Sequence, residues 1–400
     1  MQKGYSMSGV AKKMQAFAEK SSWIRKMFEE GAKMKAEFGA DKVFDFSIGN
    51  PDVPPPAKFY TVLRELAENQ QPGIHGYMPN AGYPFVREAL AKRLGREQQV
   101  NLQSGDVLMT CGAAGGLNVI FKALLDPADE VIILAPFFVE YHFYIDNHGG
   151  VAKVVPTDHD FNLDLAAIEQ ALTVKTKVVL INSPNNPTGQ IYSAESLQKL
   201  GQLLDKAGER FNTTIYLVSD EPYRNIVFDN HQVPPLMPCT TNTIIASSYS
   251  KELSLPGERI GYLAVHPQME GKESVLGAMT LANRILGFVN APALMQRAVV
   301  QLQDVSADNS IYARRLEVFC KVLDAAGITY VRPKGAFYLF PQVPIDDVEF
   351  CRLLQEQKIL AVPGRGFGMP GYIRLAFCVD EKVIAGSEEG FKKAMALAKK

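Results

Sequence analysis

The sequence predicts an α/β protein, with a mostly parallel sheet covered by helices on both faces and a second, smaller α/β domain. Between residues 107 and 265, short apolar runs alternate with segments of helical periodicity. This alternation is typical of parallel sheets, whose strands are buried beneath the helices that connect them. After Asn290-Ala-Pro292 the pattern changes, and a long helical stretch at 295–326 leads into short strand-like runs. A chain of 400 residues is long enough for two or three domains.

The individual elements follow from the spacing of apolar residues. Before the sheet, helices are expected at 8–38 with an interruption at Gly31, at 57–69 and at 84–95, and a short strand begins at Phe44. The strands of the sheet are expected at 107–111, 131–135, 151–156, 178–182, 215–219, 243–247 and 260–265. The helices between them are expected at 117–125, 141–147, 163–172 and 195–207. In the C-terminal part, strands are expected near 329–331, 336–341, 359–362 and 372–378, with helices at 346–357 and 380–398.

Three segments are expected from this pattern. Residues 1–48 form an N-terminal arm that joins the small domain, residues 49–292 form the large domain, and residues 293–400 form the small domain.

Composition excludes several classes of partner. Lys and Arg total 42 against 43 for Asp and Glu, so the net charge of −1 argues against nucleic-acid or membrane-surface binding. The five cysteines lie far apart without a CxxC motif, so we expect neither a metal site nor a disulfide framework. The N-terminus lacks the apolar core of a secretory signal, and no segment reaches the roughly 18 apolar residues of a membrane span. We expect a cytoplasmic protein that acts on small molecules.

Polar residues cluster where the predicted strands end. The run Gly112 to Gly116 follows one strand and opens a helix, which offers free backbone N–H groups to an anion. It matches neither a Walker loop nor GxGxxG, and a tight packing turn is the competing interpretation. An aromatic ring (Phe138), an amide (Asn186) and a carboxylate (Asp220) follow three other strands. Because ligands bind at the carboxyl ends of such strands, we expect one shared site.

Lys251 is the central residue of this predicted site. By itself a lysine between two strands is more often a surface cation, since a reactive amine needs a lowered pKa and a bound partner. Two arginines, Arg259 and Arg374, suggest two anions, one a phosphate on the helix N-terminus and one a carboxylate held bidentately. A carboxylate at Asp220 and a phenol at Tyr223 suit an aromatic cofactor with a ring nitrogen and a phenolic oxygen. Pyridoxal 5′-phosphate has all of these groups.

These residues carry a family resemblance that covers nearly the whole chain. The markers are IGNPD, TCGAAGGL, the Pro136–Phe138 turn, NNPTG, SDEPY, SYSK with an arginine eight residues on, and VPGRGFG followed by IRLAF. In this order the chain resembles the fold-type I, class I/II aminotransferases that use pyridoxal phosphate. The resemblance implies a mixed, mostly parallel seven-stranded sheet sandwiched by helices, with a smaller α/β domain built from both ends of the chain.

The resemblance also implies catalytic roles. Lys251 would hold the cofactor as an aldimine and then move a proton on the substrate. Asp220 would pair with the ring nitrogen, Tyr223 and Asn186 would hydrogen-bond the phenolic oxygen, and Phe138 would stack on the ring.

Binding roles follow in the same way. The cofactor phosphate would rest on Ala113 and Ala114, with Ser248 and Arg259, and Tyr77 would reach the phosphate of a neighbouring subunit. The active unit would therefore be a homodimer with its sites at the interface.

The substrate would be an amino acid whose α-carboxylate binds Arg374, Asn186 and the backbone at Gly49. Arg284 is either a second cation for a side-chain carboxylate or a solvated helix residue. The implied reaction moves an amino group from an L-amino acid to a 2-oxo acid by a ping-pong mechanism through pyridoxamine phosphate, with aspartate, alanine or aromatic substrates. The alternatives are a carbon–sulfur β-lyase and, more remotely, a regulatory domain, which would need a DNA-binding module.

Overall fold

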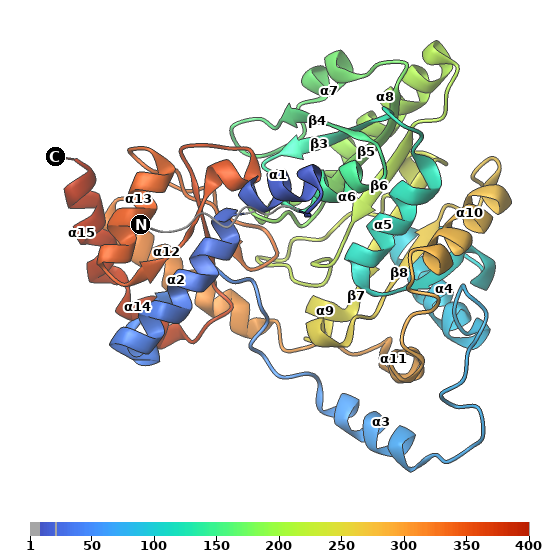
Figure 1. The fold of residues 1–400 in the computed structure, drawn as a ribbon, viewed down its shortest axis with the longest axis horizontal. Helices are drawn as coiled ribbons and strands as arrows, with labels where there is room; N and C mark the ends of the chain where they lie inside the picture. Colours follow the sequence, from blue (N-terminus) through green and yellow to red (C-terminus); the bar gives the residue numbers. More distant parts are fainter. Residues whose placement is uncertain (1–8, 21, 400) are drawn as a thin grey trace.

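The computed structural model describes residues 9–20 and 22–399, so residues 1–8 of the predicted N-terminal arm lie outside the described chain. The side chains at 19–29 and 40 are likewise not described. The chain forms a large α/β body and a smaller one, which both ends of the described chain help to build (Figure 1).

A seven-stranded sheet organises the large body, as predicted. Its strands are β2 (Val107–Thr110), β3 (Glu130–Ala135), β4 (Val151–Pro156), β5 (Thr176–Asn182), β6 (Tyr216–Asp220), β7 (Thr243–Ser248) and β8 (Gly261–Val265). The order across the sheet is β2-β8-β7-β6-β5-β3-β4. β8 runs antiparallel to β2 and β7, and the other strands are parallel to one another. The fold class predicted from the sequence is therefore confirmed.

Helices cover both faces of this sheet. One face packs against α5 (Gly112–Leu124), α6 (Tyr141–Asn147) and α10 (Lys272–Ile285). The other packs against α7 (Leu165–Ala171) and α8 (Ala194–Phe211) at one end, and α3 (Ala57–Glu68), α4 (Pro84–Gln98) and α11 (Ala293–Val299) at the other. The side chains of adjacent residues in a strand point to opposite faces of the sheet. In β2, Leu108 packs against α5 and Met109 packs against α4.

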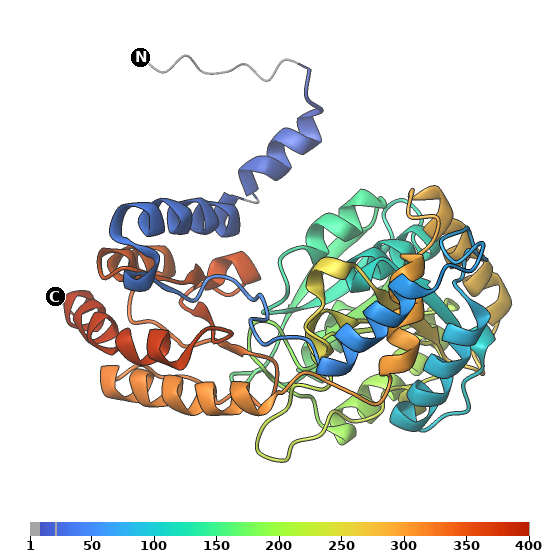
Figure 2. The ribbon, with the colours of Figure 1, turned by 90° about the horizontal axis from the view of Figure 1, so that it is seen from below.

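The small body combines two short sheets with helices. One sheet pairs β1 (Phe44–Asp45) with β10 (Ile359–Leu360), and the other has the order β11 (Val362–Pro363), β12 (Ile373–Ala376), β9 (Tyr338–Leu339). The helices are α2 (Ser22–Phe38), α12 (Ser310–Ala326), α13 (Asp347–Glu356), α14 (Glu381–Gly386) and α15 (Glu388–Ala398). Figure 2 shows α12, drawn in orange, along the lower edge of this body. α1 (Lys12–Lys20) instead reaches the large body, where Phe17 contacts Phe143 of α6 edge-to-face.

Short 3-10 turns complete the chain: η1 (Ala40–Lys42), η2 (Ser104–Asp106), η3 (Met237–Cys239), η4 (Pro256–Glu258), η5 (Val300–Leu302) and η6 (Gly364–Phe367).

Several expected elements differ in the structure. Gly31 does not interrupt a helix but lies buried inside α2, where a Cβ atom would come within 2.9 Å of Leu360. The predicted helix at 295–326 is two α-helices, α11 and α12, separated by residues 300–309, and residues 329–331 form no strand. No range was predicted for α10, although Val275, Met279 and Ala282 have the helical spacing that faces the sheet.

The position of α11 bears on the domain boundary. Met295, Ala298, Val299 and Leu302 pack in the same apolar cluster as α3 and α4 of the large body. We therefore propose that the boundary lies between Leu302 and Ser310, later in the chain than the sequence indicated.

Candidate active site

A cavity of about 410 Å³ opens between the carboxyl end of the sheet and the small body. Residues from both bodies line it, and they include most of the residues singled out in the sequence. Those that line the cavity are Gly49, Ala113, Ala114, Phe138, Asn186, Asp220, Tyr223, Ser248, Lys251, Arg259 and Arg374. The structure thus brings this set together around one cavity at the strand ends.

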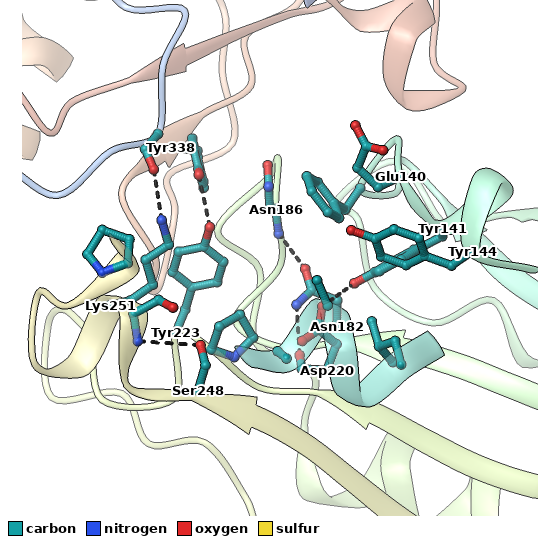
Figure 3. Close-up of a pocket in the computed structure, with 18 of the residues that line it drawn as sticks. Glu140, Tyr141, Tyr144, Asn182, Asn186, Asp220, Tyr223, Ser248, Lys251 and Tyr338 are labelled. Atoms are coloured by element: carbon teal, nitrogen blue, oxygen red, sulfur yellow. Dashed lines mark hydrogen bonds between the residues drawn. The ribbon is translucent and has the colours of Figure 1, made fainter. Parts of the chain in front are cut away.

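Lys251 enters the cavity from a single helical turn, α9 (Tyr249–Glu252), that directly follows β7. Ser248 caps this turn by accepting a hydrogen bond from the backbone N–H of Ser250. The Nζ atom of Lys251 donates to the carbonyl oxygen of Gly49 at 2.8 Å (Figure 3). Burial lowers the pKa of Lys251 to about 8, and the charges of Arg374 and Arg259 act in the same direction. The amine is thus close to losing its proton near neutral pH.

Asp220 ends β6 at the floor of the cavity. Its Oδ2 atom accepts a hydrogen bond from the Tyr141 hydroxyl at 2.7 Å, while its Oδ1 atom is buried and has no hydrogen-bond partner among the described residues. Burial raises the pKa of Asp220 to about 7. A buried, unpaired carboxylate oxygen is costly, so Asp220 suits a ligand that brings a protonated nitrogen.

Two side chains that the sequence analysis missed support this floor. Tyr141 lies three residues after Phe138 at the start of α6, and Asn182 is the last residue of β5. Asn182 donates to the backbone oxygen of Asp220 at 2.8 Å and accepts from the backbone N–H of Asn186 at 2.7 Å. A polar residue at the end of a buried strand was the available signal for Asn182.

In Figure 3 Tyr223 lies between Lys251 and Asp220, and Asn186 lies above Asn182. The Tyr223 hydroxyl shares a hydrogen bond of 2.9 Å with the hydroxyl of Tyr338, which belongs to β9 of the small body. The two bodies thus meet through polar groups inside the cavity.

Arg374 projects from β12 of the small body into the cavity. Its guanidinium donates to Asn186 Oδ1 at 3.2 Å and to the Ser47 carbonyl at 2.7 Å, and its Nε atom is buried without a partner among the described residues. The rings of Tyr338 and Phe367 lie 4.8 and 4.9 Å from it. These partners are all neutral, so this buried cation is suited to bind an anion.

A second anion receptor lies at the N-terminus of α5. This helix begins at Gly112, earlier than the predicted start at 117, so the backbone N–H groups of Ala113 and Ala114 belong to its first turn. Gly112 has a φ of 72°, and a Cβ atom there would come within 2.9 Å of Arg259 Nη2. The glycine thus lets the guanidinium of Arg259 lie against the helix terminus, where both favour a phosphate.

Two predicted residues lie outside the cavity. Tyr77 is 94% exposed on the loop between α3 and α4, and Arg284 is exposed on α10. Within the described chain neither residue lines the site.

The cavity therefore offers two anion receptors, one amine of lowered pKa and one buried carboxylate beneath aromatic rings. Pyridoxal 5′-phosphate fits this set: the phosphate matches the α5 terminus and Arg259, the ring nitrogen matches the free oxygen of Asp220, and the aldehyde matches Lys251. The fold and the site define a pyridoxal-phosphate enzyme.

Comparisons with known proteins place it more narrowly. Residues 41–385 match the model of the family "aminotransferase class I and II". The aspartate aminotransferase of Thermotoga maritima is 36% identical over 366 residues, which cover 88% of this chain and 92% of the relative. An amino transferase structure from Eubacterium rectale superposes with a TM-score of 0.95 at 37% identity, covering 98% of this chain and 100% of the other. The structure of the Thermus thermophilus aspartate aminotransferase with maleate superposes with a TM-score of 0.83 at 28% identity, and the match covers 96% of this chain and 99% of the other.

The chain belongs to the aminotransferase class I and II family and is a pyridoxal-phosphate-dependent aminotransferase. These relatives are all aminotransferases, so the lyase alternative is not favoured. Across the described residues, no helix is both long and apolar enough to cross a bilayer.

Proposed function

We propose that the enzyme transfers the α-amino group of an L-amino acid to a 2-oxo acid by a ping-pong mechanism, with a broad range that includes aspartate, alanine and aromatic substrates. The observation that carries this proposal is the buried guanidinium of Arg374, held by neutral oxygens in the same cavity as Lys251. An α-amino acid presents a carboxylate and an amine on one carbon, so it can engage both groups at once. The names of the relatives support aspartate as one substrate.

The cofactor supplies an aldehyde that condenses with amines and a ring that accepts electrons from the bond being broken. In our proposal the Lys251 amine would hold the cofactor and, once the substrate is bound, would accept and return the proton of the substrate α-carbon. A pKa of about 8 makes this amine a usable base and acid near neutral pH. Asp220 keeps the ring nitrogen protonated, because its charge lies in a buried position where ion pairing is strong.

The remaining residues orient the two ligands in this proposal. Tyr223 and Asn186 donate hydrogen bonds to the phenolic oxygen, and Phe138 covers one face of the ring. Ala113 and Ala114 bind the phosphate through backbone N–H groups, since their side chains carry no hydroxyl, together with Ser248 and Arg259. Gly49 offers its backbone beside Arg374 for the α-carboxylate. We assign no such role to Arg284.

A spectroscopic half-reaction tests the proposed function. The loaded enzyme is mixed with single amino acids in the absence of a 2-oxo acid, and the visible absorbance of the cofactor is followed. We expect the absorbance to disappear while one equivalent of 2-oxo acid forms, and to return when another 2-oxo acid is added. Release of pyruvate and ammonia without this cycle would instead identify a β-lyase.

We also propose that the active unit is a homodimer in which Tyr77 reaches the phosphate bound by the partner subunit. The loop of Tyr77 is fixed on the segment after α10, since Asn80 donates to the Val289 carbonyl at 3.1 Å and Asn290 donates to the Pro79 carbonyl at 3.0 Å. An exposed phenol on this hydrogen-bonded loop and two exposed apolar residues of α10, Leu281 and Ile285, are features of an interface.

The dimer predicts a mass in solution of twice the 44.1 kDa of the chain, measured by light scattering. Replacing Tyr77 with phenylalanine removes one hydrogen bond to a charged group, so we expect the dissociation constant of pyridoxal phosphate to rise about tenfold. Tyr60 is also exposed and lies on α3, so Tyr60→Phe is the matched control and should leave this dissociation constant unchanged. A monomeric holoenzyme, or equal constants in both variants, would contradict the proposal.

We further propose a cytoplasmic location, which the five free cysteines support because a reducing compartment keeps thiols unpaired.

A further inference from the structure

Glu140 is a carboxylate in the cavity wall that none of the roles above uses. It directly precedes α6, yet its side chain makes no capping hydrogen bond to that helix. Within the described chain its carboxylate forms no ion pair and no hydrogen bond. Figure 3 shows the carboxyl group turned away from Asp220, on the same side of the cavity as Tyr141 and Tyr144.

Burial makes this position costly. The residue is half-buried, and burial raises the pKa of the Glu140 carboxyl above its ordinary value. A charged group that is partly desolvated without a structural partner is more often found at a functional site than elsewhere. Glu140 therefore calls for an explanation in terms of what enters the cavity.

The charges that line the cavity can be assigned one by one. The cations are Lys251, Arg259 and Arg374, and the anions are Asp220 and Glu140. In the proposed function Arg259 is paired with the phosphate, Arg374 with the substrate α-carboxylate and Asp220 with the ring nitrogen. Lys251 must lose its charge to react. Among the lining residues of this chain no cation is left for a second carboxylate of the substrate, and the one unassigned charge, that of Glu140, is negative.

We propose that Glu140 is a specificity-determining residue that disfavours substrates with a side-chain carboxylate and favours amino acids with neutral side chains, including amides. This inference rests on the proposed function and narrows it, ranking alanine, aromatic and amide substrates ahead of aspartate. The half-buried Glu140 carboxylate repels a second carboxylate that enters the cavity. It can accept a hydrogen bond from the amide of asparagine at the same position.

Asparagine and aspartate form the sharpest test, because they have nearly the same shape and differ in charge. Like charges a few ångströms apart at a protein surface repel enough to change an equilibrium roughly tenfold or more. We therefore expect the native holoenzyme to show a higher kcat/KM for asparagine than for aspartate. In Glu140→Gln the ratio of kcat/KM for aspartate to kcat/KM for asparagine should rise about tenfold over the native ratio. The kcat/KM for alanine should stay within about twofold of the native value.

A binding measurement gives a readout that does not depend on turnover. Calorimetry on the holoenzyme yields the dissociation constants of maleate and of its half-amide, which are not amino donors. The native enzyme should bind the half-amide more tightly, and Glu140→Gln should narrow or reverse this preference. Tyr144→Phe changes the same wall without changing its charge, so it should keep the native preference.

The outcomes separate this inference from the proposed function. If no amino acid, alanine included, converts the cofactor, the proposed function fails. If alanine and asparagine react but the aspartate-to-asparagine ratio is the same in native and Glu140→Gln enzymes, only the role of Glu140 is overturned. A native preference for aspartate over asparagine would overturn it as well.

Discussion

Replacing Lys251 with alanine is expected to lower the transamination rate about 10⁴-fold, at the upper end of what a positioned acid–base group contributes. The variant loses the amine whose Nζ atom lies 2.8 Å from the Gly49 carbonyl and whose pKa burial lowers to about 8. It also loses the nucleophile that anchors the aldehyde. Reduction with borohydride followed by peptide mass spectrometry checks this directly, because cofactor mass should appear on the Lys251 peptide of the native enzyme and be missing in the variant.

A matched lysine separates this effect from a general change in charge. Lys321 is exposed on α12, and Lys321→Ala should keep the native rate. Lys251→Arg keeps the positive charge but cannot condense with an aldehyde at neutral pH, so it should be as inactive as Lys251→Ala. A Lys251→Ala enzyme that transaminates at the native rate would contradict the assignment of this residue.

Local sequence was sufficient for the residues that follow strands. Asp220 ends β6 and Lys251 lies three residues after β7, so an apolar run followed by a polar residue located both. Arg374 could not be placed from such a pattern, because it belongs to another sheet. It was located by the IRLAF motif of the family resemblance. The start of α5 was placed too late because Gly-Ala-Ala-Gly-Gly was read as a turn, whereas burial of this segment against β8 lets it form the first helical turn.

What the sequence could not show depends on contacts between distant elements. The hydroxyl of Tyr141 reaches Asp220 only because α6 and β6 meet at the same end of the sheet. Glu140 was not singled out in the sequence, and only its missing cap and its place in the cavity wall set it apart. Tyr77 was identified by the family resemblance alone. Its side chain is almost fully exposed, so no contact within the chain points to a function for it.

A buried network of charges lies behind the site and was also invisible in the sequence. Arg93 of α4 is paired with Glu252 and with Glu97, both at 2.7 Å. Arg224 is paired with Glu221 at 2.8 Å and lies 3.8 Å from Glu97, which joins the two halves. Arg93, Glu221 and Glu252 are each at least nine-tenths buried.

This network is adjacent in sequence to two catalytic candidates. Glu252 directly follows Lys251 within α9, and Glu221 directly follows Asp220 at the end of β6. The ion pairs therefore fix the backbone from which both side chains enter the cavity. Removing one member leaves a charge buried without its partner, which costs far more than the loss of a surface pair.

We expect Arg93→Met to lower the free energy of unfolding by about 3–5 kcal/mol, measured by denaturant titration. The loss should depend on pH in a defined direction. Burial already raises the pKa of Glu252, with Arg93 opposing it, so removing Arg93 raises this pKa further. The folded variant then binds a proton that the unfolded chain releases, and its stability falls as pH rises from the ordinary carboxyl pKa towards neutrality. The difference in the free energy of unfolding between the native enzyme and Arg93→Met should thus be smaller at acid pH than at neutral pH.

Two comparisons show whether the buried pair is the cause. Lys92→Met on the same helix breaks an exposed pair with Glu88 and should change stability by less than about 0.5 kcal/mol. Combining Arg93→Met with Glu252→Leu removes both buried charges, so it should recover much of the loss and abolish its pH dependence. Two results would contradict this role of the network in holding α9 in place. One is an Arg93→Met variant no more destabilised than Lys92→Met, and the other is a loss of unfolding free energy in Arg93→Met that grows as pH falls.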